Sequence, residues 1–322
     1  MPISRESINE AEDKEYSFAR LGKDNLDDLA LLYAEVYGIP AENNYFRRKY
    51  DTAYAGVENV GFIAYDKEDL PVAYYGVIPC FIQSGNEIIL AAQSADTMTH
   101  PHHRYKGMFV KLSAMTFNLC CELGIKLIFG FPNQNFYNAV INKPGWTTTE
   151  SMECFAIPVA GLPFESIAAK IGFKKLYSRY GLSVVKKNVI HLDGVANSVV
   201  GDGFAGVYRN DEYLHYKTYN ASKVIGIGES KIWISLKQGL VIGDMEGVNE
   251  SNFAAVINEI KQIAKKLGVR QIQFHSSPGT VLHQLFSVNY KPGPSFHVIF
   301  QDFGSPVPLK EIKFTFADID IF

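Results

Sequence analysis

The chain has 322 residues, of which 47% are apolar and 20% charged, a composition typical of a globular protein with room for two domains. Its formal net charge of -3 argues against a protein that binds nucleic acid by general neutralisation of phosphates. No apolar run approaches the ~20 residues that a membrane-spanning helix needs, and the polar, acidic N-terminal stretch is unlike a secretory signal. We therefore expect a cytoplasmic protein that binds neither nucleic acid nor a membrane.

In chain order, residues 1–15 read as a solvated tail and 16–21 as a strand. Asn25 can cap a helix with apolar residues on one face, and a second helical segment covers 42–50. Three strand patterns follow, separated by turns as in an antiparallel meander: 61–65, 72–78 and 87–94. Further on, a strand at 127–131, a helix at 133–142 and a strand at 151–159 complete the first part of the chain.

The most distinctive segment is 97–109, where a strand runs into a basic loop and then into a predicted helix over 107–123. The loop would leave backbone N–H groups unpaired at the positive end of the helix dipole, and such a nest binds phosphate. Arg104 and Lys106 add positive charge beside it. The pattern therefore predicts a local anion site in a chain that is acidic overall.

This loop resembles the pyrophosphate loop of the GNAT superfamily of N-acyltransferases, whose pattern is Arg/Gln-x-x-Gly-x-Gly/Ala. Arg104 and Gly107 occupy the first two fixed positions, whereas Phe109 stands where a small residue is usual. The order of elements over 16–158 is also similar to the GNAT fold, an α/β (α+β) fold with a mixed, mostly antiparallel sheet flanked by helices. The resemblance implies an N-acyltransferase whose co-substrate is acetyl-CoA or another short acyl-CoA.

A weak internal repeat suggests a second copy of this fold. Segments 45–49, 123–129 and 142–145 have similar counterparts, in the same order, at 213–217, 267–273 and 289–293. We therefore expect a tail (1–15), a GNAT domain (16–160), a helical connector (161–195) and a degenerate GNAT-like domain (196–322). The acidic segment 244–251 replaces the phosphate loop in the second copy and would repel a pyrophosphate. Only the first copy should bind CoA, while the second forms one wall of the acceptor cleft.

The resemblance also assigns residues to the cofactor. Thr97, Met98 and Thr99 would line the pantetheine arm, and N–H groups of their strand could polarise the thioester carbonyl. Asn133 and Asn135 could cap the next helix or bind the same arm. The pyrophosphate would contact the loop and the first turn of the helix: Arg104, Tyr105, Lys106, Gly107, Met108 and Phe109.

Proton transfer has several candidates. Asp96 and His100 lie at the end of the strand and could act as the base, or water could carry the proton away. Relatives often use a tyrosine as the acid, four residues before a Gly-aromatic pair, but Ile141 occupies that position here. Tyr137 lies one turn earlier and could protonate the leaving thiolate. The four cysteines are expected to be reduced core residues, and no metal site is predicted: Cys80, Cys120, Cys121 and Cys154.

Arg47 and Arg48 lie in the helix that borders the acceptor site in relatives, and would suit an anionic acceptor. Tyr74, Tyr75 and Trp233 could stack on a base or sugar, although packing in the core is the more common role of aromatic residues. We therefore favour a nucleotide-linked amino sugar of polysaccharide biosynthesis as the small-molecule amine acceptor, attacked directly in a ternary complex.

Two other functions stay open. A CoA-binding regulatory or assembly protein without catalysis would account for Ile141 and Phe109. An aminoacyl-tRNA-dependent peptidyl transferase is disfavoured by the net charge. The alternating segment 313–322 could form a strand that pairs within the chain or with another subunit, so a homodimer is a further expectation.

Overall fold

The computed structural model describes residues 15–133, 137–138, 140–141, 145–161, 164, 174–236 and 239–322. Its N-terminal half comprises β1 (Ser17–Arg20), α1 (Leu26–Tyr37), α2 (Tyr45–Lys49), η1 (Ala53–Ala55), β2 (Val60–Tyr65), β3 (Pro71–Ser84), β4 (Glu87–Thr99), η2 (Pro101–His103), α3 (Met108–Glu122), β5 (Leu127–Gly130) and β6 (Trp146–Pro158).

The C-terminal half comprises α6 (Lys174–Val185), β7 (Val189–Ile190), α7 (Ser198–Gly201), β8 (Gly206–Val207), α8 (Asp211–Lys217), β9 (Ser222–Ile227), β10 (Ser230–Ser235), β11 (Leu240–Glu246), α9 (Phe253–Leu267), β12 (Gln271–Ser276), α10 (Val281–Asn289), β13 (Pro292–Asp302), η3 (Leu309–Glu311) and η4 (Phe316–Asp318). None of the helices in the described residues is long and apolar enough to cross a membrane.

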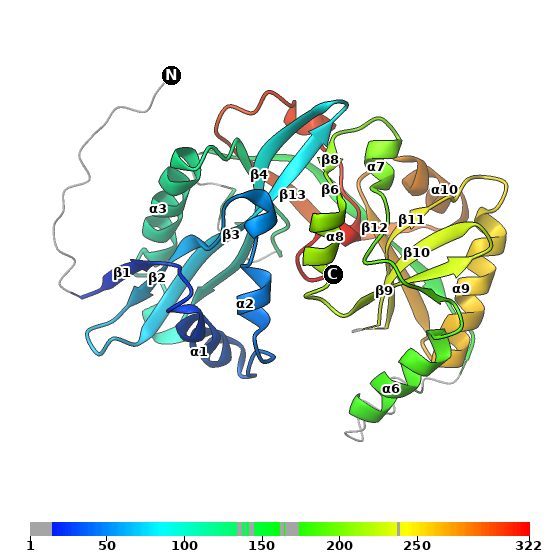
Figure 1. Ribbon diagram of the computed structural model, residues 1–322, viewed down its shortest axis with the longest axis horizontal. Coiled ribbons are helices and arrows are strands. Elements are labelled where there is room, and N and C mark those ends of the chain that lie inside the picture. The colour runs from blue at the N-terminus through cyan, green and yellow to red at the C-terminus, as the bar shows by residue number, and fades with distance from the viewer. Residues whose placement is uncertain are drawn as a thin grey trace.

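The described strands form one 13-stranded sheet in the order β1-β2-β3-β4-β5-β13-β6-β12-β11-β10-β9-β7, with β8 paired to β3. Most neighbouring strands are antiparallel, whereas β4 with β5 and β11 with β12 are parallel pairs. In each parallel pair a helix, α3 or α9, makes the crossover that parallel strands require. The predicted fold class is confirmed: a mixed α/β protein whose large, mostly antiparallel sheet is flanked by helices (Figure 1).

The two halves exchange strands at the centre of the sheet. β13 from the C-terminal half lies between β5 and β6, and β6 from the N-terminal half lies between β13 and β12. The register pairs Ile299 with Gly130 on one side and His275 with Cys154 on the other. Each half therefore pairs with a strand of the other half. Separating the two halves would break a ladder of backbone hydrogen bonds and leave its N–H and C=O groups without partners.

Helices cover both faces of the N-terminal half of the sheet. Tyr74 and Tyr75 are neighbours on β3, and consecutive strand residues point to opposite faces. Tyr75 packs with Leu112 and other buried residues of α3. Tyr74 packs instead with Leu29 and other buried residues of α1, so α1 and α3 lie on opposite faces.

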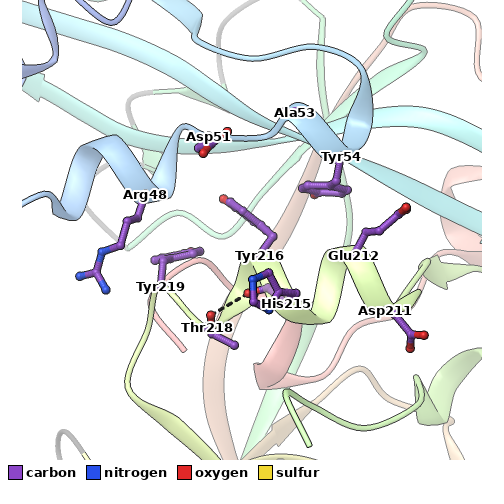
Figure 2. Close-up of a pocket in the computed structure, with 10 residues that line it drawn as sticks. All are labelled: Arg48, Asp51, Ala53, Tyr54, Asp211, Glu212, His215, Tyr216, Thr218 and Tyr219. Carbon is purple, nitrogen blue, oxygen red and sulfur yellow. Dashed lines mark hydrogen bonds between the residues drawn. The ribbon is translucent and has the colours of Figure 1, made fainter.

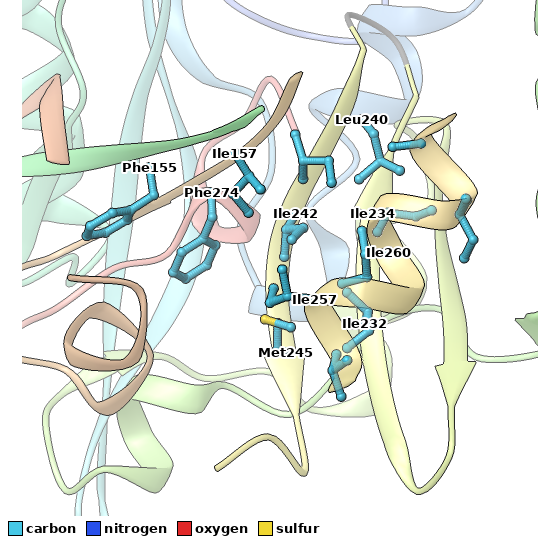
Figure 3. Packing of buried hydrophobic residues seen from close by; sticks show 14 of the residues in the cluster. Phe155, Ile157, Ile232, Ile234, Leu240, Ile242, Met245, Ile257, Ile260 and Phe274 are labelled. Atoms are coloured by element: carbon cyan, nitrogen blue, oxygen red, sulfur yellow. The ribbon is translucent and has the colours of Figure 1, made fainter. Parts of the chain in front are cut away.

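In the C-terminal half, α9 buries one apolar stripe against the sheet (Figure 3). Its buried residues follow the three-to-four spacing of an amphipathic helix and include Ile257 and Ile260. The stripe belongs to a cluster that also holds Phe155 of β6 and Phe274 of β12. The exchanged strand β6 thus contributes to the core of the half that it joins.

The predicted elements of the first part of the chain are confirmed from β1 to β6, with boundary shifts of a few residues. The segment 95–99 is the continuation of β4 rather than a separate strand. The prediction of a strand at 313–322 is wrong: this segment contains η4 and buries Phe314 and Phe322 within the chain. Residues 1–14 of the expected tail, most of the helix at 133–142 and part of the connector at 161–195 lie outside the described residues.

Two of the cysteines occupy the core as expected. All four are free thiols, and Cys80 and Cys120 are buried. Cys121 is exposed, so its expected place in the core is wrong, because it lies on the outer face of α3 beside Cys120. Cys154, on β6, is partly buried.

A buried ion network fastens the C-terminal segment to the second half. The Arg209 guanidinium donates to Asp244 at 2.7 Å and to Asp318 at 2.8 Å, and all three side chains are almost fully buried. Burial raises the pKa of Asp244, while the nearby guanidinium partly offsets that shift. The single arginine therefore faces two carboxylates, one on β11 and one on η4.

We predict that Arg209→Met destabilises the fold by about 3–5 kcal/mol, because it leaves two buried carboxylates without their cation. Arg47→Met is the matched control: it breaks the exposed Arg47–Asp27 pair, which is also 2.8 Å long, and should cost at most about 1 kcal/mol. Urea unfolding of both variants measures the difference. If both variants lost an equally small free energy of unfolding, the prediction that the buried network contributes more than the exposed pair would be wrong.

Candidate active site

A bulge in β4 opens the sheet beside β5. Tyr74 of β3 pairs with Met98, but Gly76 pairs with Ala95, so Asp96 and Thr97 both stand opposite Tyr75. Asp96 adopts a left-handed backbone with φ of 51°, a conformation that aspartate tolerates better than most residues. Beyond the bulge, β4 and β5 diverge, because their parallel ladder pairs only Ala92 with Ile128 and Gln93 with Phe129.

A cavity of about 260 Å³ lies where the two strands separate. Asp96 and Thr97 line it from β4, and Gly130 and Asn133 line it from the end of β5. Two further residues arrive from distant parts of the chain: Tyr37 at the end of α1 and Asp320 near the C-terminus. The bulge therefore places a carboxylate in a hollow between two parallel strands.

Lys49 joins the two carboxylates that line this cavity. Its ammonium is 2.8 Å from Asp96 and 2.7 Å from Asp320, and its side chain is 1% exposed. The hydroxyl of Tyr50 also donates to Asp96 at 2.9 Å. Burial alone would lower the pKa of Lys49, but the attraction of Asp320 and Asp96 outweighs it and raises that pKa well above its usual value. The lysine is therefore charged at neutral pH.

The loop after β4 brings backbone and side-chain positive charge to the N-terminus of α3. Gly107 precedes the helix with φ of 78° and supplies no capping side chain, so the helix itself offers no partner for the N–H groups of its first turn. Arg104 donates to the Thr99 carbonyl at 3.4 Å. Lys106 contacts the Tyr16 hydroxyl at 2.8 Å and Glu15 at 2.9 Å, which raises the pKa of this lysine. Tyr105 is fully exposed.

Phe109 turns away from this loop. Its ring packs edge-on against Tyr75 with the ring centroids 5.6 Å apart. The side chains of Met98 and Met108 are buried, so these two residues could reach a ligand through their backbones only, whereas Phe109 is partly buried. The large residue at the position where relatives carry a small one is thus accommodated by the core.

Three aromatic residues expected at the acceptor are core residues instead. Tyr74 is 1% exposed, and Tyr75 and Trp233 are 0% exposed. The Trp233 indole donates to Ser222 at 2.9 Å, and its ring packs against Phe322. Their predicted stacking on a substrate is therefore wrong, because no face of these rings reaches the surface.

His100 and Tyr137 lie outside the cavity. His100 accepts a long hydrogen bond of 3.4 Å from the His102 backbone, in a group of histidine rings at the end of β4. The Tyr137 hydroxyl is 3.2 Å from Thr148, and its ring stacks on His297 with the centroids 3.8 Å apart. Their catalytic roles stay predictions, and Asn135 lies outside the described residues.

A larger cleft of about 580 Å³ separates α2 and η1 from α8 (Figure 2). Tyr54 and Tyr216 both line it and pack against each other, with ring centroids 5.0 Å apart. Arg48 stands at one end, and Asp211 and Glu212 at the other. A neighbouring hollow of about 400 Å³ shares Arg48, Thr218 and Tyr219 with it. Of the two predicted arginines, Arg48 lines both hollows, whereas Arg47 pairs with Asp27 on α1.

Some of these residues had no signal in the sequence. Lys49 is visible only as the third of three consecutive cations, and nothing marks it as buried. Asp320 is 271 positions from Lys49, so their contact cannot be read from spacing. Among the described residues, no group of three or more His, Cys, Asp or Glu side chains is arranged to hold a metal ion.

These features coincide with a recognised domain. Residues 17–149 match the acetyltransferase (GNAT) domain family. The matched stretch runs from β1 into β6 and includes the bulge in β4, the basic loop and α3. The match supports an N-acyltransferase that uses acyl-CoA.

Solved structures show the same fold at low sequence identity. A GCN5-related N-acetyltransferase from Kribbella flavida has a TM-score of 0.57 and 12% identity, over 91% of this chain and 73% of that one. A probable N-acyltransferase from Enterococcus faecalis V583 has a TM-score of 0.58 and 12% identity, over 90% and 73%. The N-myristoyltransferase of Saccharomyces cerevisiae, solved with myristoyl-CoA, has a TM-score of 0.53 and 10% identity, over 92% and 83%. No curated protein matches in sequence.

Gly107→Glu should weaken acetyl-CoA binding at least about 100-fold, because it places a carboxylate in the anion nest. No atom lies within 4 Å of a Cβ built at Gly107, so a Cβ at this position meets open space. Gly107→Ala is the control: it shares the unfavourable positive φ, a strain of about 1–3 kcal/mol, but adds no charge. Calorimetric titration compares the three proteins. Wild-type affinity in Gly107→Glu would show that the loop does not hold the pyrophosphate.

Proposed function

We propose that this protein is an N-acyltransferase that moves an acetyl or another short acyl group from CoA to the primary amine of a small acceptor. The observation that carries the proposal is one strand, β4, that leads from the Asp96 bulge directly into the basic loop and α3. A phosphate-binding end and a carboxylate-lined cavity on the same strand are what a bound acyl-CoA needs. The GNAT match over residues 17–149 supports the same assignment.

In this proposal each group of residues has one task. The N-terminus of α3 binds the pyrophosphate together with Arg104 and Lys106. The backbone from Thr97 to Thr99 binds the pantetheine arm, and the cavity beside Asp96 receives the thioester. Asp96 accepts a proton from the acceptor amine, which then attacks the carbonyl carbon directly in a ternary complex.

We further propose that residues 196–322 are a degenerate copy of the first domain. The repeated segments 123–129 and 267–273 both run from the end of a crossover helix, α3 or α9, into the next strand. Segments 45–49 and 213–217 likewise fall on α2 and α8. In the second copy Asp244 is already paired with Arg209, and the loop that follows it is acidic, so CoA would bind the first copy alone.

For the acceptor we propose a nucleotide-linked amino sugar of polysaccharide biosynthesis. Arg48 would bind its phosphates, and Tyr54, which is half-buried and lines the cleft, would contact the base or sugar. Asp51, Asp211 and Glu212 line the same cleft and outnumber the arginine. They favour a second acceptor class, a polyamine or aminoglycoside, which lacks the phosphates that Arg48 would bind. Thiol release from acetyl-CoA in the presence of each class tests the proposal.

Arg48→Ala should raise the KM for a nucleotide-linked amino sugar about tenfold or more, since a charge-assisted hydrogen bond contributes about 1.5–3 kcal/mol. Arg47→Ala is the matched control and should leave that KM within about twofold, because Arg47 faces Asp27. Steady-state kinetics of thiol release measure both. If Arg48→Ala lowers the KM for spermidine, and no thiol release is seen with nucleotide-linked amino sugars, the acceptor is instead the polyamine or aminoglycoside class.

Two tyrosines compete for the role of the acid that protonates the thiolate. Tyr37 lines the cavity and is 52% exposed, and its partial burial together with the Asp96 charge raises its pKa. A tyrosine phenol is protonated at neutral pH and so has a proton to give. Tyr137 was expected from the sequence but contacts Thr148. We predict a lower kcat in Tyr37→Phe than in Tyr137→Phe, with acetyl-CoA affinity unchanged in both. A slow Tyr137→Phe beside a normal Tyr37→Phe would reverse the assignment.

A further inference from the structure

We propose that Asp320 is a second carboxylate of the active site. Asp96 and Asp320, bridged by Lys49, together bind the ammonium form of the acceptor, and one of them takes its proton. This inference rests on the proposed N-acyltransferase function and identifies the amine-binding group. It also gives the C-terminal segment a direct part in a site whose other polar lining residues belong to the N-terminal half.

The two carboxylates occupy equivalent places. Each side chain is 14% exposed, each lines the 260 Å³ cavity, and each accepts from the same ammonium. The lysine is 1% exposed and is not among the residues that line the cavity. An acceptor amine entering the cavity would therefore meet the two acids before the lysine.

The charges of this trio do not balance. One ammonium needs one carboxylate, and Asp96 alone satisfies that need at 2.8 Å. Asp320 adds a second negative charge beside a partly enclosed cavity, where excess charge is costly. The buried ammonium of Lys217 on α8 also interacts with this charge, but burial lowers the pKa of Lys217 to about 7, so it offsets the charge of Asp320 only in part at neutral pH. A cationic ligand would restore neutrality, and the acceptor of an N-acyltransferase is such a cation, because a primary alkylamine is protonated at neutral pH.

Residues of the C-terminal half hold Asp320 in place. The Tyr219 hydroxyl and the Asn220 amide both donate to its carbonyl oxygen at 2.8 Å. Lys217 donates to the preceding carbonyl, that of Ile319, at 2.8 Å. On the far side Phe322 is 1% exposed and packs against Trp233. The carboxylate therefore belongs to a fixed segment whose anchors flank it on both sides.

The proposed step balances as follows. The ammonium R–NH₃⁺ gives one proton to a carboxylate, and the freed lone pair forms the C–N bond at the thioester carbonyl. The C–S bond then breaks, and its electron pair leaves on the CoA sulfur, which takes a proton. The nitrogen loses a second proton as the amide forms. The sum is acyl–S–CoA and R–NH₃⁺ converted to acyl–NH–R, HS–CoA and one proton released to solvent.

The test compares Asp320→Asn with wild type, Asp96→Asn and the double variant, using spermidine and a uridine-diphosphate-linked amino sugar as acceptors. Asp320→Asn should lower kcat/KM for the accepted amine by about 100-fold and leave the Kd for acetyl-CoA within about twofold. The acid limb of its pH profile should move, because one of two coupled carboxylates is gone. The double variant should lose less than the product of the single losses, since both residues serve one proton.

Glu311→Gln is the control, because Glu311 is an exposed acid just upstream of the segment and does not line the cavity. If Asp320→Asn does not fold, Asp320→Glu keeps the charge and moves it by one methylene. A folded Asp320→Glu enzyme with reduced kcat and normal acetyl-CoA binding would support the proposal. Wild-type kcat and pH profile in either Asp320 variant would overturn it while the N-acyltransferase function stands. Absence of acetyl-CoA binding by wild type would instead overturn the function and this inference together.

Discussion

The geometry of the site depends on the buried ammonium of Lys49. Its position is set by α2, yet its two partners come from β4 and from the C-terminal segment, so three regions of the chain must be in place before both carboxylates contact it. A buried lysine without a partner would be strongly unfavourable. Asp96 and Asp320 can therefore both face the cavity only when both halves of the chain have assembled around Lys49.

The exchange of β6 and β13 explains how this assembly is enforced. Each half contributes one strand to the centre of the sheet, and that strand pairs with the other half. The segment after β13 then runs back between the halves, where Asp318 pairs with Arg209 and Asp320 with Lys49. Lys49 in the first half and Arg209 in the second half thus hold Asp320 and Asp318, two aspartates that are separated in the sequence by one residue. Backbone hydrogen bonds supply the cohesion, and these ion pairs set the position of the segment along the cavity.

Much of the N-terminal half could be predicted because its signals are local. Turn residues bound the strands of the meander, α3 has a near-3.6 apolar repeat, and the loop before it concentrates charge around Gly107. The alternation in 313–322 gave a wrong prediction for a physical reason: Phe314, Ile319 and Phe322 are indeed buried, but the segment turns through η4 between Phe314 and Ile319 instead of forming a strand. Asp320 and Tyr37 could not be assigned, because their proximity to Asp96 arises only from tertiary contacts.

The difference between the two halves follows from where each places its charge. Both have a parallel strand pair and a crossover helix, and in both an aspartate lies on the strand before that helix. Asp96 shares a lysine with a second carboxylate and remains at the edge of a cavity, whereas Asp244 is fully buried against Arg209. The first half keeps a basic loop before α3, and the second has Glu246 and Glu250 before α9. The charges of these two segments therefore differ in sign, while the second half keeps the packing that positions Asp320.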